Sequence, residues 1–268
     1  MMFPLLRAEL HLLRRDSTAS VTAVALPLVI GGMWIVGDPP IGDGVGALAV
    51  IQLMVMLAFT LHSVGVMILA SRREAGVLRR WRVSGASDTV ILGGTLGVPT
   101  ALAVLQAWAL TAVTAWVWEV VPGRIDLVVL GTLLGTVVLI GWTIFAAAFT
   151  RSAEHSMITT FPVIMLLVFG TTFALGRPLE SVDWAVLAIP VGPAIQLLRM
   201  GWETTAATGS GLLIALAAGA VHTLIAAVAA WIYFRWSPAH ADEGGSRTTA
   251  ATDRLARATR GLVGAGQS

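Results

Sequence analysis

Residues 44–71 have the sequence GVGALAVIQLMVMLAFTLHSVGVMILAS, and RREAGVLRRWRVSGAS follows directly over residues 72–87. The first stretch carries no charged side chain and exceeds the roughly 20 apolar residues that a helix needs to cross a bilayer. Its apolar residues run on without the period-two alternation of a barrel strand. The second stretch holds five arginines, which is typical of a loop on the cytoplasmic side of a membrane. Together they predict a membrane-spanning helix that ends in a basic cytoplasmic loop.

Five more uncharged runs of similar length occur in the chain, so the sequence predicts an all-α integral membrane protein with six transmembrane helices. A seventh apolar stretch, 184–198, has only 15 residues and contains Pro190, Gly192 and Pro193. It is too short and too interrupted to span the bilayer, so we expect two half-helices there, re-entrant or interfacial, before the last span. The predicted spans are about 18–37, 46–70, 89–118, 127–150, 155–176 and 208–234.

The composition supports a membrane protein and excludes several other classes. Of the 268 residues, 56% are hydrophobic and 12% are charged, with a mean hydropathy of +0.83, whereas soluble domains carry about 25% charged residues. The chain has no cysteine, which excludes disulfides and thiolate metal sites. All 17 of its basic residues are arginine. Without lysine the chain cannot contain the phosphate-binding lysine of a Walker A loop, nor form a Schiff base.

The arginines also predict the orientation of the spans. With six spans, one side of the membrane would hold the N-terminus, the loops 72–88 and 151–154, and the C-terminal tail. Fourteen of the 17 arginines fall on that side, so we expect both termini in the cytoplasm and the protein in the plasma membrane of a bacterium. The same bias explains the positive inner face without a nucleic-acid site, and the lipid bilayer is the partner it implies.

The two ends of the chain differ from the spans. Residues 1–16 combine Phe3, Leu6, Leu10 and Leu13 at helical spacing with arginines on much of the other face, which predicts an amphipathic helix lying on the membrane interface. The six spans and their loops then occupy residues 17–236. Residues 237–268 are rich in Ser, Ala, Thr and Gly and contain no long apolar run, so we expect a disordered cytoplasmic tail.

Few polar side chains lie within the predicted spans. The candidates for a substrate path or for a structural hydrogen bond are Gln52, His62, Gln106 and His222. The two histidines have no carboxylate nearby in sequence, so we predict no metal site and no proton relay. Glycines four residues apart, Gly93 with Gly97 and Gly131 with Gly135, would allow close helix packing. The sequence contains no set of residues typical of a catalytic site.

The loop over 72–87 has more structure than a positive loop requires. Val77, Trp81 and Val83 form a partial apolar stripe among the arginines, and Gly85 and Ser87 are expected to end one helix and cap the next. This pattern predicts a short helix across the membrane surface with apolar residues available to a partner. The alternative is a plain basic loop that only sets the topology.

This stretch resembles the cytoplasmic loop of type-2 ABC-transporter permeases, in which an R-E-x-G-x-L-x-R-like segment precedes a turn and the third span. The matching residues are Arg73, Glu74, Gly76, Leu78, Arg80 and Ser84, and the sequence departs at Gly85, where many relatives have proline. The entry into the first span and the segment 177–199, with its proline-containing half-helices, are also similar to that family. The resemblance covers residues 1–236.

The resemblance implies the membrane subunit of a half-transporter. Two permease subunits, as a homodimer or heterodimer, would pair above two copies of a separate ABC ATPase, which binds the ATP, so this chain would bind no cofactor and would not be an enzyme by itself. Similar permeases export drugs and antibiotics, and the apolar spans suit a lipophilic or amphipathic cargo, so we expect a drug, an antibiotic or a lipid-like molecule. The alternatives are a secondary transporter and, less favoured, an intramembrane enzyme. The resemblance assigns ATPase coupling to Arg72, Arg73, Glu74, Gly76, Leu78, Arg80, Trp81 and Ser84.

Overall fold

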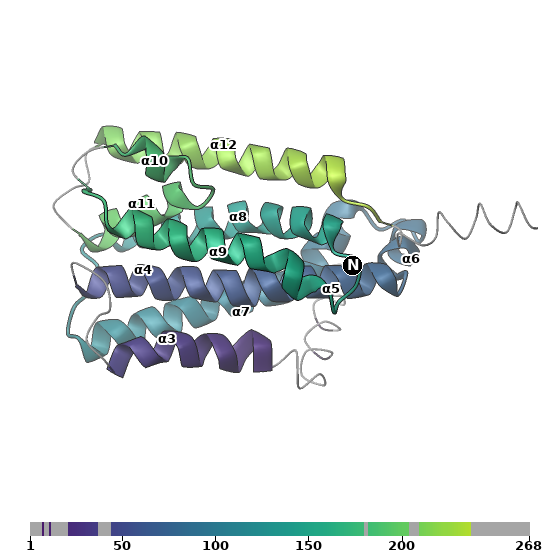
Figure 1. Ribbon diagram of the computed structural model, residues 1–268, viewed down its shortest axis with the longest axis horizontal. Coiled ribbons are helices and arrows are strands. Elements are labelled where there is room, and N and C mark those ends of the chain that lie inside the picture. The colour runs from purple at the N-terminus through teal and green to yellow at the C-terminus, as the bar shows by residue number, and fades with distance from the viewer. Residues whose placement is uncertain are drawn as a thin grey trace, which may run out of the picture.

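The computed structural model of the protein describes Arg7, His11 and residues 21–36, 44–179, 182–203 and 209–236. Every regular element within these residues is a helix. The long helices run side by side in one bundle, with α6 at one end and α10 toward the other (Figure 1). In chain order the elements are η1 (Val21–Ala25), α3 (Leu26–Val36), α4 (Val45–Met56), η2 (Leu57–Ser63), α5 (Val64–Glu74), α6 (Val77–Val83), α7 (Asp88–Val117), α8 (Ile125–Phe149), α9 (Ser156–Leu175), α10 (Trp184–Leu187), α11 (Gly192–Trp202) and α12 (Gly209–Tyr233).

In this described part, five helices are long and apolar enough to cross a membrane. They are Val45–Glu74, Asp88–Val117, Ile125–Phe149, Ser156–Leu175 and Gly209–Tyr233, which correspond to the last five of the six predicted spans. The first predicted span contains only a shorter apolar helix, Ala23–Ile35, below the length of a full crossing. The structure therefore confirms an all-helical protein with five candidate spans, and the sixth stays a prediction.

The remaining predicted segments have different outcomes. The interfacial helix over 1–16 lies outside the described residues except for Arg7 and His11, which are helical and exposed, and so does the tail over 237–268. The stretch predicted to form two half-helices contains α10 and α11. Asp183 caps α10 by accepting hydrogen bonds from the amides of Ala185 and Val186 at 2.9 and 3.4 Å. Their position relative to a membrane stays a prediction.

The turn between α6 and α7 has the form that the sequence predicts. Gly85 has a φ of +86°, in the left-handed region that ends helices, and the amide of Ala86 donates to the carbonyl of Trp81 at 3.2 Å. Ser87 then caps α7, because its side chain accepts from the amide of Val90 at 3.4 Å. Proline, which many resembling permeases have at the position of Gly85, could not adopt this positive φ.

The second predicted span lies at the centre of the bundle. In its most hydrophobic stretch 78% of the residues are buried, against 17% in α12. Leu48, Leu53, Met56 and Leu61 on this span are at most 2% exposed. Figure 1 shows α4 and α5 in the middle of the bundle, with α3 along one edge and α12 along the other. The central span can therefore contact helices on both sides.

One of the two predicted close-packing motifs is used within the chain. A methyl group on Gly131 would lie 2.9 Å from Leu198 and 3.0 Å from the carbonyl oxygen of Ala194, both on α11. A methyl group on Gly135 would lie 3.2 Å from the side chain of Ala194. These two glycines of α8 therefore make room for α11 rather than for a second subunit.

Candidate functional site

The segment from Arg72 to Ser84 forms the last turn of α5, a two-residue connection (Ala75 and Gly76) and the helix α6. Gly76 provides the reversal, with a φ of +67° that side chains with a Cβ rarely adopt. Helix α6 then covers one end of the bundle (Figure 1). The sequence-predicted coupling residues are thus brought together at this end.

Arg73 points inward from this segment. Its side chain lies beneath the bundle surface, with the residue 6% exposed. Nη1 donates to the carbonyl oxygen of Ala147 at 2.9 Å, and Nη2 donates to that of Thr150. These carbonyls belong to the C-terminal end of α8, where backbone oxygens lack helical donors and carry partial negative charge. Arg73 therefore caps α8 and is not exposed to a partner.

Two apolar residues hold α6 against the membrane helices. Leu78 is 0% exposed and packs in a cluster with residues of α5, α7 and α8. Trp81 is half-buried against the same cluster, which Phe234 and Trp236 at the end of α12 also join. We expected the apolar stripe of α6 to be available to a partner, but the structure places most of Trp81, and all of the nearby Leu78, against the protein's own core.

The outer side of α6 is polar with one apolar residue. Glu74, Arg80 and Ser84 are exposed, and Arg72 is half-buried. Arg80 donates to the carbonyl of Ala75 at 3.0 Å, and Ser84 donates to the carbonyl of Trp81 at 2.8 Å.

Val83 stands out on this side, with 81% of its surface exposed. The sequence showed it only as one member of the stripe, because periodicity does not tell which face of a seven-residue helix is covered.

Gln52 and Gln106 hold three helices together. Gln106 donates to the carbonyl oxygen of Ala23 at 3.0 Å, and the Thr60 hydroxyl lies 2.9 Å from that oxygen and 2.8 Å from Gln106 Oε1. Ala23 precedes Pro27 by four residues, and proline has no N–H to give it the usual α-helical hydrogen bond. The Ala23 carbonyl therefore lacks the backbone N–H donor that it would have in a regular α-helix. Side chains from η2 and α7 supply hydrogen-bond donors to it instead.

Gln52 forms a second set of hydrogen bonds that connects the same helices. Gln52 donates to the carbonyl oxygen of Gly31 at 2.9 Å and accepts from Thr114 at 2.8 Å. All four side chains in the two sets of hydrogen bonds are at most 5% exposed. Of the two roles that the sequence left open for the glutamines, the contacts favour bonding to neighbouring helices.

The two histidines also bond across helices. His62 is fully buried in η2, and its Nδ1 lies 3.1 Å from Thr143 Oγ1. Because the Thr143 hydroxyl donates to the carbonyl of Leu139 at 2.7 Å, Nδ1 is assigned as the donor to Thr143, and Nε2 has no hydrogen-bond partner among the described residues. His222 lies 2.8 Å through Nε2 from the carbonyl oxygen of Leu187 on α10. Each histidine joins its span to a neighbour.

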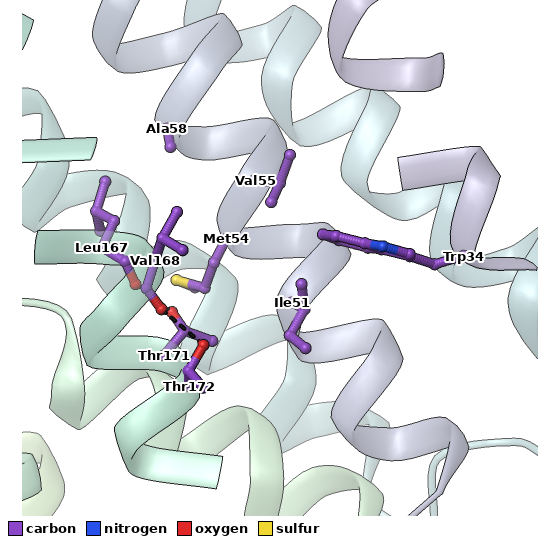
Figure 2. A pocket seen from close by; sticks show the side chains of 9 residues that line it. All are labelled: Trp34, Ile51, Met54, Val55, Ala58, Leu167, Val168, Thr171 and Thr172. Atoms are coloured by element: carbon purple, nitrogen blue, oxygen red, sulfur yellow. Dashed lines mark hydrogen bonds between the residues drawn. The ribbon is translucent and has the colours of Figure 1, made fainter. Parts of the chain in front are cut away.

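An apolar pocket opens between α3, α4–η2 and α9, in the half of the bundle away from α6. Figure 2 shows Trp34 on one side, Ile51 and Val55 in the middle, and α9 on the other side. Its volume is about 180 Å³. Thr171 and Thr172 turn their hydroxyls back to carbonyls of their own helix, at 2.6 and 3.0 Å, so they offer the pocket mainly methyl groups. The lining consists of Trp34, Ile51, Met54, Val55, Ala58, Leu167, Val168, Thr171 and Thr172.

The end of the bundle opposite α6 has its own buried arginine. Arg199 on α11 is 4% exposed, and its Nη1 donates to the carbonyl of Ala174 at 2.5 Å and of Arg177 at 2.9 Å. Its Nε lies 3.1 Å from Glu203. Arg199 thus caps α9 as Arg73 caps α8. Nearby, an exposed hydrogen bond from Arg124 to Asp126 raises the pKa of Arg124.

Comparisons with known proteins point to one family. The profile of the ABC-2 type transporter family matches residues 3–202. The match therefore includes η1 through α11, with the α6 segment and the pocket, and stops before α12. No curated protein and no solved structure matches the chain significantly. Among the residues that the structure describes, no three His, Asp or Glu side chains gather as a metal site would require.

Proposed function

The chain belongs to the ABC-2 type transporter family, and we propose that it forms the translocation path of an ATP-driven exporter and docks through α6 on a separate ATPase subunit. The observation that carries this proposal is the two-sided character of α6. One side is fixed to the membrane helices by Leu78 and Trp81, and the other exposes Val83 beside arginines. A loop that only sets topology needs the arginines but not a helix anchored to the core.

The ATP chemistry would belong to the partner. The chain has no lysine, so it lacks the residue with which a Walker A loop contacts nucleotide phosphates. Two ATPase copies beneath two permease subunits would give each α6 one docking site. Purified alone, the protein should therefore bind no nucleotide and hydrolyse no ATP.

A second permease subunit has a suitable surface on α9. Met157, Ile158, Phe161 and Phe169 on this helix are 60–83% exposed. The same helix also lines the pocket of Figure 2, through Leu167, Val168, Thr171 and Thr172. Pairing two chains along α9 would bring the two pockets close to one central path, and their apolar lining suits a lipophilic or amphipathic cargo.

The direction of the protein in the membrane follows from its charges. In the described chain, the end of the bundle with α6 holds seven arginines, whereas Arg124, Arg177 and Arg199 lie at the other end. By the positive-inside rule, this difference supports a location of α6 in the cytoplasm of a bacterium, within reach of an ATPase. Both termini would lie on that side.

The proposal is tested by reconstitution with the ABC ATPase that we expect to be encoded next to this chain. Proteoliposomes containing both proteins should hydrolyse ATP faster than the ATPase alone and move a lipophilic dye across the bilayer. A chain that fails to bind this ATPase, or that hydrolyses ATP by itself, would contradict the proposal. A Walker A lysine variant of the ATPase provides the control for contaminating activity.

A further inference from the structure

Two grooves outside the functional site join at one point near the α6 end of the bundle. One has a volume of about 940 Å³ and follows α7 from Asp88 to Trp108. The other has a volume of about 370 Å³ and follows α12. Asp88, Leu92, Ile140 and Ile144 line both grooves. We propose that this two-branched groove is a binding site for one anionic diacyl phospholipid, with its head group at the shared end and one acyl chain in each branch.

The α7 branch contains the other close-packing motif, Gly93 with Gly97. Its wall includes Gly93, Gly97, Ala101 and Leu105, which follow one another at four-residue spacing. Gly93 and Ala101 are exposed, and Leu105 is 67% exposed. Because glycine and alanine carry so little side chain, this face of α7 is a channel and not a ridge. From Asp88 to Trp108 it is about 30 Å long at 1.5 Å per residue, which exceeds the depth of one leaflet, about half of the 30 Å hydrocarbon core.

The α12 branch is shorter and equally apolar. Its wall includes Gly141 of α8 and Ala227, Ala230, Trp231 and Phe234 of α12. The lining of α12 extends from Thr223 to Phe234, a rise of about 16 Å, which matches the depth of one leaflet. Both branches are therefore long enough for an acyl chain that starts at the shared end.

Charged residues lie at the shared end and beside it: Asp88 lines both branches, and Arg82 contacts Asp88 from outside the lining. Asp88 forms an ion pair with Arg82, with Nε 3.1 Å from Oδ1. The Arg82 guanidinium also lies 4.9 Å from the centre of the Trp236 ring, so it joins α6 to the end of α12. Arg235 is the exposed neighbour of Trp236, and no ion pair is found for it in the described part of the chain. The positive charges of Arg82 and Arg235 therefore exceed the single negative charge of Asp88 in this region.

A lipid explains these features better than a transmembrane helix does. A helix of about 10 Å diameter could follow one branch but could not divide between two. It would also leave Arg235 without an anion, whereas basic pockets between helices are typical sites for anionic head groups. Exposed tryptophan at the mouth, with Trp231 at 85%, is typical of the head-group level of a bilayer.

The test uses the full-length protein in detergent and native mass spectrometry. Dioleoyl phosphatidylglycerol should bind with one molecule per chain, at least ~10-fold more tightly than dioleoyl phosphatidylcholine, because the acyl chains are identical and only the head-group charge differs. Ala101→Trp and Ala227→Trp, each of which fills one branch, should weaken phosphatidylglycerol binding by ~10-fold. The double variant R82Q/R235Q should remove the preference for phosphatidylglycerol and leave phosphatidylcholine binding unchanged.

Matched controls are available on the same helices. Ala109 of α7 and Ala220 of α12 are exposed and line neither branch, so A109W and A220W should bind lipid like wild type. If A101W does not fold, Leu105→Trp tests the same branch. Equal affinity for the two lipids, or equal losses in A101W and A109W, would overturn the proposal. So would a photo-crosslinker at position 101 that captures a polypeptide instead of lipid.

Discussion

Arg73 Nη1 donates to the carbonyl oxygen of Ala147 at 2.9 Å, which ties the end of α5 to the end of α8. The contact continues across the bundle, because Arg73 also donates to the carbonyl of Thr150. The Thr150 hydroxyl in turn lies 2.7 Å from that of Thr159 on α9. Helix α9 lines the apolar pocket at the other half of the bundle. A continuous set of hydrogen bonds thus connects the base of α6 to the helix that faces the proposed path.

The first prediction concerns this cap. Arg73→Gln should lower the free energy of unfolding by about 2 kcal/mol or more, because hydrogen bonds from charged donors contribute about 1.5–3 kcal/mol each. Thermal unfolding in detergent measures the change, and hydrogen exchange should rise at residues 148–152. Arg79→Gln is the matched control, since Arg79 is exposed on the outer side of α6. Equal melting temperatures for the two variants would show that the cap contributes nothing.

The second prediction separates docking from folding on α6. Val83→Asp should weaken ATPase binding by ~30-fold, the equivalent of a hot-spot loss of ~2 kcal/mol, and should leave the melting temperature unchanged because Val83 is 81% exposed. Leu78→Ala should instead lower stability by about 2–5 kcal/mol, since Leu78 is fully buried. Pull-down titration and thermal unfolding measure the two effects. An unfolding-neutral V83D variant that binds the ATPase normally would remove α6 from the interface.

The third prediction concerns the carbonyl of Ala23. Gln106→Leu should cost about 1–3 kcal/mol of stability, because it removes a buried donor to that oxygen. Pro27→Ala should reduce the cost of Gln106→Leu, because alanine returns the N–H that proline lacks. A double-mutant cycle by thermal unfolding measures this coupling. If the effects of the two substitutions on stability are strictly additive, Gln106 does not replace the hydrogen bond that Pro27 cannot donate to the Ala23 carbonyl.

The fourth prediction tests the pocket of Figure 2. Val168 lines the pocket and is 37% exposed, so Val168→Trp can fill the cavity without overpacking the core. Transport of a lipophilic substrate should fall several-fold, while ATPase binding through α6 stays unchanged. Leu213→Trp on α12 is the control, because Leu213 is 69% exposed and lies outside the pocket. Normal transport by V168W would exclude this cavity from the path.

The fifth prediction concerns orientation. The chain has no cysteine, so single cysteines can be labelled without background. Gly123→Cys, between α7 and α8, should react in intact cells with a thiol reagent that does not cross membranes. Ser84→Cys, after α6, should react only once the membrane is opened. Both positions are exposed, so the reverse labelling pattern would place α6 outside the cell.

The sequence was sufficient to predict what depends on hydrophobic length and turn chemistry. The runs of uncharged residues predicted the five long helices, and Gly85 with Ser87 predicted the turn before α7, because a left-handed glycine and an N-cap are local features. It could not predict that Trp81 packs against the end of α12. That contact joins residues far apart in the chain, and the periodicity of a local segment cannot predict such a contact.

The same limit applies to the arginines. The family resemblance assigned Arg73 and Arg80 the same role in one basic segment, but the structure buries the first and exposes the second. The difference arises because α8 ends beside Arg73 and its last carbonyls need donors. The sequence of residues 72–84 alone does not show that the end of α8 lies beside Arg73 and needs hydrogen-bond donors.

The Ala23 carbonyl also sets an order of events during synthesis. Its two side-chain donors, Thr60 and Gln106, are 37 and 83 residues further along the chain. When the first helix emerges from the ribosome, neither donor has yet been made, and hydrocarbon offers the oxygen no substitute. The first helix therefore has reason to remain at the insertion machinery, or in contact with water, until the third long apolar segment arrives. We therefore expect the membrane integration of three helices to be cooperative, with the earliest one translated among the last to be secured.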